Sequence, residues 1–255
     1  MQGRMTRSGL WAAEGGAGDG DALVVLLHGL GATAAVWHGL VPSLAARGYR
    51  WLAPDLRGHG RSPSGGPFGY GNHAADIAAL LAEQDMERVT VLGHSFGGVV
   101  GATLASGLFG PVPARVIALG VKTDWTEDEV NGALALATRP ARVFATQDEA
   151  QARYLKLSGL HGLVTPEAPE AEAGIRQQAE GWALAMDPRV FGAVGPDIPA
   201  LLAACQCPLH LAAGADDPMA SPETMRRIAP AARLLPGLPH NAHVADPGAV
   251  AALLG

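Results

Sequence analysis

The chain has 255 residues, of which 48% are hydrophobic and 16% are charged, so we expect one packed globular domain, which can carry an insertion, and no disordered chain. A net charge of −6 argues against nucleic acid as a partner, because phosphate binding needs clustered Lys and Arg. Apolar runs such as 22–27 are too short to span a membrane, and no apolar stretch follows the first basic residues. We therefore expect a cytoplasmic protein, with no prediction of its oligomeric state.

Short, mostly apolar runs, several rich in β-branched residues, predict strands buried on both faces of a parallel sheet. They lie at 22–27, 50–54, 89–92, 114–119, 208–213 and 231–235. Helical patterns that stop at or near glycine alternate with them, at 34–47, 71–84 and 96–106. This alternation predicts an α/β fold with a doubly wound, mostly parallel sheet, to which 6–13 would add an antiparallel edge hairpin.

The alternation stops between the fourth and fifth of these strands, where no strand is evident. Two capping-box patterns predict helix starts in this segment: Thr126 with Glu129, and Thr146 with Glu149. A third helix is expected over 170–185, ended by Asp187-Pro188. We therefore predict a helical cap of residues 122–199 inserted into a core made of 1–121 and 200–255.

A serine flanked by glycines falls between a predicted strand and a predicted helix, in Gly93-His94-Ser95-Phe96-Gly97. A nucleophile held in such a tight turn projects from the carboxyl edge of the sheet, next to the free N–H groups of the helix. With 34 glycines in the chain the pattern can also arise by chance. Its placement favours Ser95 as a nucleophile.

A second glycine-rich turn, His28-Gly29-Leu30-Gly31, ends the first strong strand at the same carboxyl edge. Its backbone can approach the serine, so that the N–H groups of Leu30 and Phe96 would stabilise a tetrahedral oxyanion. The alternative is that this turn is only a flexible connection.

An attacking serine needs a base, and a neutral imidazole is well suited to that role near pH 7. His240 is favoured because it follows the last predicted strand, in Pro236-Gly-Leu-Pro-His240. His243 is its nearest rival. Three other histidines fall within helical or strand patterns, where a structural role is expected: His38, His73 and His210.

The third member of such a site is a carboxylate that orients the imidazole. Asp217, in Gly214-Ala-Asp-Asp-Pro218, follows a predicted strand and gives the chain order Ser, Asp, His. Asp216 and Asp124 are the alternatives. No metal or organic cofactor is expected, and Cys205 and Cys207 are interpreted as ordinary thiols.

Together these motifs resemble the α/β-hydrolase superfamily, and specifically its small, cap-bearing, esterase-like members. The resemblance covers nearly the whole chain and rests on His28-Gly-Leu-Gly31 with Trp37, Asp55-Leu-Arg-Gly-His-Gly-Arg-Ser62, Gly93-His-Ser-Phe-Gly-Gly98, Gly214-Ala-Asp-Asp-Pro218, and His240 before Asp246-Pro247. It implies Ser95 as nucleophile, Asp217 as acid and His240 as base, with Leu30 and Phe96 as oxyanion donors. Pro239 stands before His240, where the family commonly has glycine.

The serine at the turn separates this chain from similar epoxide hydrolases and haloalkane dehalogenases, which use aspartate there. Carboxylesterase, lactonase, thioesterase, carbon–carbon bond hydrolase, and perhydrolase or acyltransferase activities all keep the serine, and the triad does not distinguish among them. A lyase or a ligand receptor on the same fold is a further alternative.

The expected substrate is a small to medium apolar ester or acyl compound. Its expected contacts are Trp37, Trp125, Phe144, Trp182 and Met219, although aromatic residues of a cap can equally serve to pack it onto the sheet. A highly charged substrate is not expected, because the segment has no arginine cluster in sequence. Its scattered arginines could still converge in space: Arg139, Arg142, Arg153 and Arg176.

Overall fold

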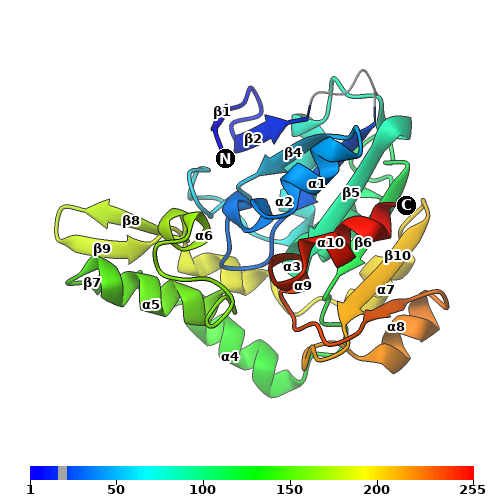
Figure 1. The fold of residues 1–255 in the computed structure, drawn as a ribbon. Helices are drawn as coiled ribbons and strands as arrows, with labels where there is room; N and C mark the ends of the chain where they lie inside the picture. Colours follow the sequence, from blue (N-terminus) through cyan, green and yellow to red (C-terminus); the bar gives the residue numbers. More distant parts are fainter. Residues whose placement is uncertain (17–21) are drawn as a thin grey trace.

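The computed structural model describes residues 1–16 and 22–255, which form a central eight-stranded sheet (Figure 1). Its strands run in the order β1-β2-β4-β3-β5-β6-β10-β11. They are β1 Gly3–Met5, β2 Trp11–Gly15, β3 Leu23–Leu27, β4 Arg50–Pro54, β5 Val89–His94, β6 Arg115–Leu119, β10 Leu209–Gly214 and β11 Arg233–Leu235. The pairs β1–β2 and β2–β4, at one edge, are antiparallel and the other pairs are parallel, which confirms the predicted, mostly parallel sheet.

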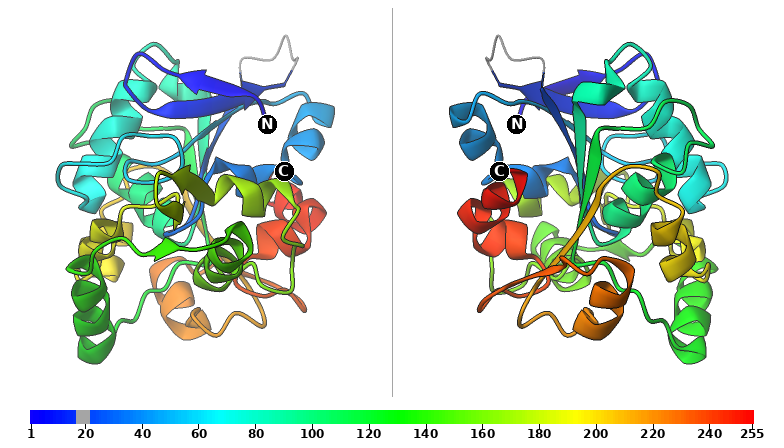
Figure 2. Two further views of the ribbon diagram at one scale, coloured as in Figure 1. Left: turned by 90° about the vertical axis from the view of Figure 1, so that its left-hand side faces the viewer. Right: turned by 90° about the vertical axis from the view of Figure 1, so that its right-hand side faces the viewer.

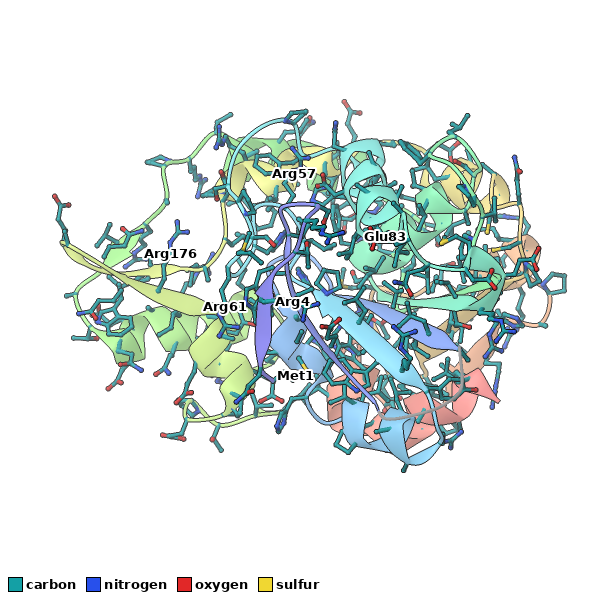
Figure 3. The ribbon with its side chains drawn as sticks, turned by 90° about the horizontal axis from the view of Figure 1, so that it is seen from above. Met1, Arg4, Arg57, Arg61, Glu83 and Arg176 are labelled. Carbon is teal, nitrogen blue, oxygen red and sulfur yellow. The ribbon has the colours of Figure 1, made fainter. Side chains whose placement is uncertain are left out.

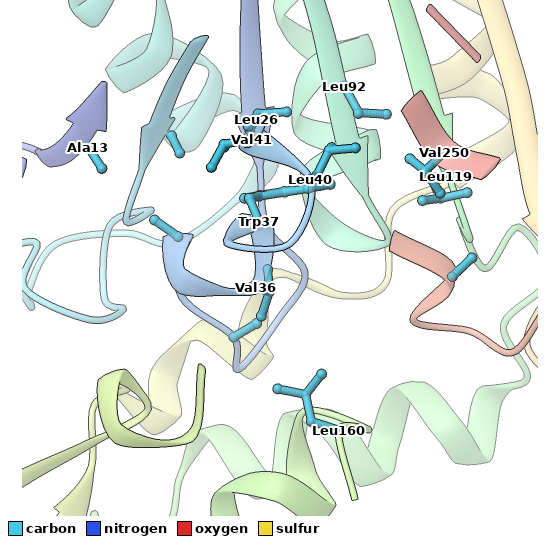
Figure 4. Packing of buried hydrophobic residues seen from close by; sticks show 14 of the residues in the cluster. Ala13, Leu26, Val36, Trp37, Leu40, Val41, Leu92, Leu119, Leu160 and Val250 are labelled. Carbon is cyan, nitrogen blue, oxygen red and sulfur yellow. The ribbon is translucent and has the colours of Figure 1, made fainter. Parts of the chain in front are cut away.

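The sheet is buried on both faces, as its apolar runs predicted. In β3, Val24 and Leu26 pack into one apolar cluster, while Leu23, Val25 and Leu27 pack into another on the opposite face. The first cluster includes Trp37. Figure 4 shows residues of this cluster between the strands and the helices that cover them. Figure 2 shows helices on both sides of the sheet.

The helices of the core differ from the predicted ranges mainly at one place. The pattern over 34–47 is divided into η1 Ala34–Trp37 and α1 Val41–Ala46, because Pro42 lacks an N–H and suits the first turn of a new helix. The other core helices are α2 Tyr70–Leu80, η2 Met86–Arg88, α3 Phe96–Leu104, α7 Ile198–Ala203, α8 Pro222–Ile228, α9 Ala242–Ala245, α10 Pro247–Ala251 and η4 Ala252–Leu254.

Residues 122–199, which we call the insertion, contain helices and a small sheet of their own. The elements are α4 Glu127–Ala137, β7 Val143–Phe144, α5 Gln147–Leu157, α6 Pro169–Ala173, β8 Ile175–Gln178, β9 Gly181–Leu184 and η3 Pro188–Ala193. Helices α4 and α5 begin where the capping patterns predicted, since the hydroxyls of Thr126 and Thr146 accept hydrogen bonds from the N–H groups of Glu129 and Glu149.

The prediction of one helix over 170–185, and with it of a purely helical cap, was wrong. The segment forms a short helix followed by an antiparallel hairpin, β8–β9, which pairs with β7. Gly174 ends α6 where a Cβ would lie 2.2 Å from the Tyr154 ring. Gly181 has φ +135°, a conformation that favours glycine and here turns the hairpin.

The insertion is attached to the core by backbone pairing near the site. Gly60 donates to the Ala185 carbonyl at 2.6 Å, and Asp187 donates to the Gly58 carbonyl at 2.8 Å. The Asn241 amide donates to the carbonyls of both Ser158 and Gly159, each at 3.0 Å, so the end of α5 is tied to the loop that follows β11. None of the helices in the described residues is long and apolar enough to cross a membrane.

Candidate active site

Ser95 occupies the turn between β5 and α3 in a strained conformation. Its φ is +49°, and among the described residues it is the one non-glycine residue with positive φ. Its N–H donates to the Leu119 carbonyl at 2.7 Å, and its carbonyl accepts from Gly98 at 3.0 Å. A strained φ that the surrounding backbone enforces is typical of a functional side chain held in a fixed direction.

The flanking glycines are required by close approach of backbone atoms. A Cβ on Gly93 would lie 2.3 Å from the Gly97 carbonyl oxygen, and a Cβ on Gly97 would lie 2.2 Å from that of Leu27. A Cβ on Gly29 would lie 2.7 Å from Nδ1 of His94 and 3.4 Å from the Cβ of Ser95. The turn after β3 therefore reaches the serine only because these positions lack side chains.

Two backbone N–H groups beside Ser95 have no hydrogen-bond partner in the part of the chain that is described. They belong to Leu30, in the turn after β3, and to Phe96, the first residue of α3. Both residues line the same cavity as Ser95. Donors of this kind, near the positive end of a helix dipole, suit a developing negative charge.

The turn that carries Leu30 is held by the motif that follows β4. Asp55 is buried and accepts hydrogen bonds from Ala34 at 2.7 Å and from Arg61 at 2.9 Å. The N–H of Gly31 donates to Nε2 of His59 at 3.1 Å. No supporting role was predicted for Asp55 and His59, although both belong to the motif 55–62, which was a signal for such a role.

His28, at the start of this turn, is also fixed as a neutral ring. Its Nε2 accepts from the Leu56 N–H at 2.9 Å, so Nδ1 carries the hydrogen that is donated to the Gly29 carbonyl at 2.9 Å. Burial lowers the pKa of His28 to about 4. The ring therefore supports the turn and does not titrate near neutral pH.

His240 and Asp217 form a hydrogen-bonded pair. Nδ1 of His240 lies 2.9 Å from Oδ2 of Asp217, whose side chain is fully buried, while the His240 side chain is 20% exposed. The other oxygen of Asp217 accepts from the Met219 N–H at 2.9 Å. A carboxylate at Nδ1 keeps the hydrogen there and leaves Nε2 as the base of the imidazole. Ser95 and His240 line one cavity.

The rival residues have other partners or surroundings. His243 is fully buried in α9 against Trp37, with ring centroids 4.5 Å apart. Asp216 is exposed, and Asp124 accepts a hydrogen bond from Thr123 at 2.8 Å. His38 lies 3.8 Å from Glu170, His73 is buried in α2, and His210 is exposed on β10.

Two buried histidines, His94 and His243, lie near His240 and carry no charge at neutral pH. Nε2 of His94 donates to the His240 carbonyl at 3.0 Å. Burial and the nearby His243 and His240 hold the pKa of His94 well below its ordinary value. Burial also lowers the pKa of His243 to about 3. At neutral pH both rings are therefore neutral neighbours of the His240 imidazole.

The cavity at this edge of the sheet has a volume of about 850 Å³ and lies between the core and the insertion. Ser95, His240, Leu30 and Phe96 contribute to its core side. Much of its lining is apolar, including Tyr70, Val99, Trp125, Ala133, Leu136, Leu157, Phe191, Val194 and Met219. Of the five predicted substrate contacts, Trp125 and Met219 lie there.

The other three predicted substrate contacts are not in this cavity. Trp37 is completely buried in the apolar cluster on one face of the sheet. Phe144 is 4% exposed and, with Trp182, pairs β7 with β9 away from the serine. Trp37 therefore packs the core and Trp182 packs against the same cluster, whereas Phe144 lines a second, smaller pocket.

The two cysteines are free, and their sulfur atoms lie 3.6 Å apart outside the cavity. The hydrogen bond from Cys207 lowers the pKa of Cys205 to about 7. No group of three or more His, Cys, Asp or Glu side chains within the described ranges is arranged to hold a metal ion.

Comparison with known proteins identifies the family of the chain. Residues 24–253 match the family described as "Alpha/beta hydrolase family", and the chain belongs to that family of hydrolases. It is 32% identical over 240 residues to "Putative carbamate hydrolase RutD" of Variovorax paradoxus (strain S110), covering 89% of this chain and 86% of that protein. It is 35% identical over 156 residues to "Lipase LipV" of Mycobacterium tuberculosis, covering 60% of this chain and 56% of that protein.

Solved structures are similar over the whole chain. The "Thioesterase Domain From Curacin Biosynthetic Pathway" superposes with a TM-score of 0.80 at 21% identity, covering 100% of this chain and 99% of that one. "E-2-(Acetamidomethylene)succinate Hydrolase" gives 0.77 at 22% identity, covering 99% and 97%. At these identities the similarity concerns the fold, which is that of an α/β-hydrolase with a mostly parallel sheet.

Proposed function

We propose that the protein is a serine hydrolase that cleaves a carboxylic ester, or a related acyl bond, through an acyl-enzyme on Ser95. The observation that carries the proposal is the meeting of three features at one cavity. A strained serine stands beside two N–H groups without partners, and a histidine there is paired with a buried carboxylate. Each feature alone has structural explanations, but together they match the needs of acyl transfer.

In the proposed reaction, Nε2 of His240 takes the Ser95 hydroxyl proton as the oxygen attacks the carbonyl carbon. The N–H groups of Leu30 and Phe96 stabilise the oxyanion of the tetrahedral intermediate. The imidazolium then gives its proton to the departing alcohol, and an acyl-enzyme remains. A water molecule, activated by the neutral ring, releases the acid and restores Ser95, while Asp217 holds the ring in its tautomer.

The insertion serves in this proposal as a cap over the core formed by residues 1–121 and 200–255. Side chains of α4 and η3, among them Leu136 and Phe191, line the cavity opposite Ser95. An apolar cavity of this size favours an acyl or alcohol group of small to medium length. Trp125 and Met219 are the substrate contacts that we retain from the sequence analysis.

The test is turnover of p-nitrophenyl esters of increasing acyl length by the wild type and by Ser95→Ala. We expect turnover that depends on acyl length and falls by about 10,000-fold in the variant, because the nucleophile is lost. A folded wild type without turnover, or a variant with full turnover, would overturn the proposal. Turnover of carbamate and thioester analogues would show which acyl bond is cleaved. Product analysis with an added alcohol would distinguish hydrolysis from acyl transfer.

A further inference from the structure

Arginines scattered along the insertion converge on one pocket beside the proposed active site. This pocket has a volume of about 340 Å³ and is lined by Arg139, Arg142 and Arg153. No carboxylate is among its lining residues in the described part of the chain. The sequence analysis left this convergence open, because Arg139 and Arg142 follow α4 whereas Arg153 lies in the middle of α5.

The arginine-lined pocket adjoins the cavity that holds Ser95. The two share four lining residues, Leu136, Arg139, Leu157 and Phe191. Three of these side chains are apolar, so the boundary between the cavity and the arginine-lined pocket is mainly apolar. A ligand with an apolar middle could therefore reach both places at once.

Positive charge continues beyond this pocket. A neighbouring depression is lined by Arg139, Arg176 and Arg189, and its one carboxylate, Asp187, is already paired with Arg189 at 2.6 Å. Figure 3 shows Arg176 on the small sheet of the insertion. Five arginines thus line these two neighbouring pockets, and one of them is paired with Asp187, in a chain whose net charge is −6. Such a local excess attracts anions.

The guanidinium groups of the pocket are available for a ligand. Within the described residues, neither Arg139, Arg142 nor Arg153 forms an ion pair. The Arg142 guanidinium lies over the Phe144 ring, 4.7 Å from its centroid, which restricts its position. A planar guanidinium with its hydrogen-bond donors free matches the oxygens of a carboxylate or a phosphate.

We propose that Arg139, Arg142 and Arg153 bind an oxyanion, a carboxylate or a phosphate, at the end of the substrate remote from the reacting carbonyl. The substrate class is then an acyl compound with an apolar middle and an anionic end. This inference rests on the proposed function, because it places the carbonyl at Ser95. It changes the expectation of a wholly apolar ester.

The test compares p-nitrophenyl esters of equal acyl length that end in a methyl, a carboxylate or a phosphate group, over a series of lengths. The quantity measured is the ratio of kcat/KM for the anionic ester to that for the neutral one, which cancels differences in the amount of folded enzyme. We expect a ratio of roughly ten at the best length in the wild type. The double variant Arg142→Gln/Arg153→Gln should bring it close to one.

Two controls sharpen this result. Arg142→Lys/Arg153→Lys should retain part of the preference, because the charge remains while the planar donors are lost. Arg226→Gln, an exposed arginine on α8 that lines neither pocket, should leave the ratio unchanged. The better of the two anionic esters identifies the group, a carboxylate or a phosphate. A wild-type ratio at or below one at every length would overturn the inference.

A binding measurement separates this inference from the proposed function. Calorimetry with Ser95→Ala reports binding of the same esters without turnover. We expect the anionic ester to bind about tenfold more weakly when Arg142→Gln and Arg153→Gln are added. If the wild type turns over no ester but this difference is found, the proposed function fails and the anion site stands. Equal binding by both variants would refute the anion site even where turnover is observed.

Discussion

The carboxyl edge of the sheet and the insertion position their side chains in different ways. At the edge, backbone contacts hold Ser95: glycines on either side meet carbonyl oxygens where a Cβ would lie, and φ is fixed at +49°. In the insertion, the residues that face the cavity come from helices whose outer surfaces are largely exposed. The position of Ser95 therefore depends on the geometry of a few neighbouring residues. The positions of the cavity-lining side chains of the insertion depend on how separate helices pack.

This difference predicts that changes at the edge act on chemistry or folding, while changes in the insertion act on substrate choice. The largest expected effect is that of His240→Ala, which removes the base paired with Asp217. Turnover of a p-nitrophenyl ester should fall by about 10,000-fold with little change in stability, since the His240 side chain is partly exposed. His210→Ala, on the exposed side of β10, serves as the control and should retain wild-type turnover.

Substitution of Trp37, in the core, and of Trp125, in the cavity, compares the effect of packing with that of substrate contact. Trp37→Ala removes a completely buried side chain and should lower the free energy of unfolding by about 4 kcal/mol. Trp125→Ala removes a cavity wall and should change KM more than stability. Urea unfolding and ester kinetics on both variants measure these effects. The division between packing and substrate contact is wrong if Trp125→Ala proves the more destabilising of the two.

One substitution, glycine to alanine, should have opposite signs in the two regions. Gly97→Ala places a Cβ 2.2 Å from the Leu27 carbonyl oxygen and should destabilise the fold by about 3 kcal/mol. Gly132→Ala meets nothing within 4 Å in α4 and should stabilise by about 1 kcal/mol, because alanine favours helix. Thermal unfolding of both variants checks the signs. Equal effects would show that backbone contact does not constrain the turn at Ser95.

The last expected effect concerns buried imidazoles near the site. His243 has no hydrogen-bond partner for either nitrogen within the described residues, and burial lowers its pKa from 6.5 to about 3. Between these values the unfolded chain binds a proton that the folded chain does not, so stability falls as pH decreases below 6.5. From pH 7.5 to pH 5 this loss amounts to about 2 kcal/mol.

His243→Phe removes that titration and should reduce the pH dependence of the unfolding free energy by this amount. Urea unfolding at pH 7.5 and pH 5 on wild type and variant measures it. His210→Gln, at an exposed position, should retain the wild-type pH dependence. If the two variants behave alike, His243 does not remain neutral in the folded chain.

The features that the sequence predicted are those encoded within a few residues. Apolar runs predicted the strands. The glycines around Ser95 predicted the turn, because nearby backbone atoms leave no room for a Cβ at Gly93 and Gly97. The N-caps Thr126 and Thr146 gave two helix starts in the insertion. The pairing of Asp217 with His240 follows from both lying at the ends of neighbouring parallel strands.

The features that the sequence did not predict depend on contacts between distant elements. The hairpin β8–β9 replaces a predicted helix because Ile175 and Ala183 are buried in it and Gly181 turns it, with β7 as the third strand. Trp37 was assigned to substrate, but composition does not tell which face of an element is inside. The convergence of Arg142 and Arg153 is likewise visible only after folding.

The central claim is that Ser95 is an activated nucleophile, and covalent labelling tests it most directly. Wild type and Ser95→Ala would each be treated with a fluorophosphonate, followed by intact mass measurement and peptide mapping. The account predicts one adduct on the wild type, located on Ser95, and none on the variant. A folded wild type that stays unmodified, or a variant that labels equally, would contradict it.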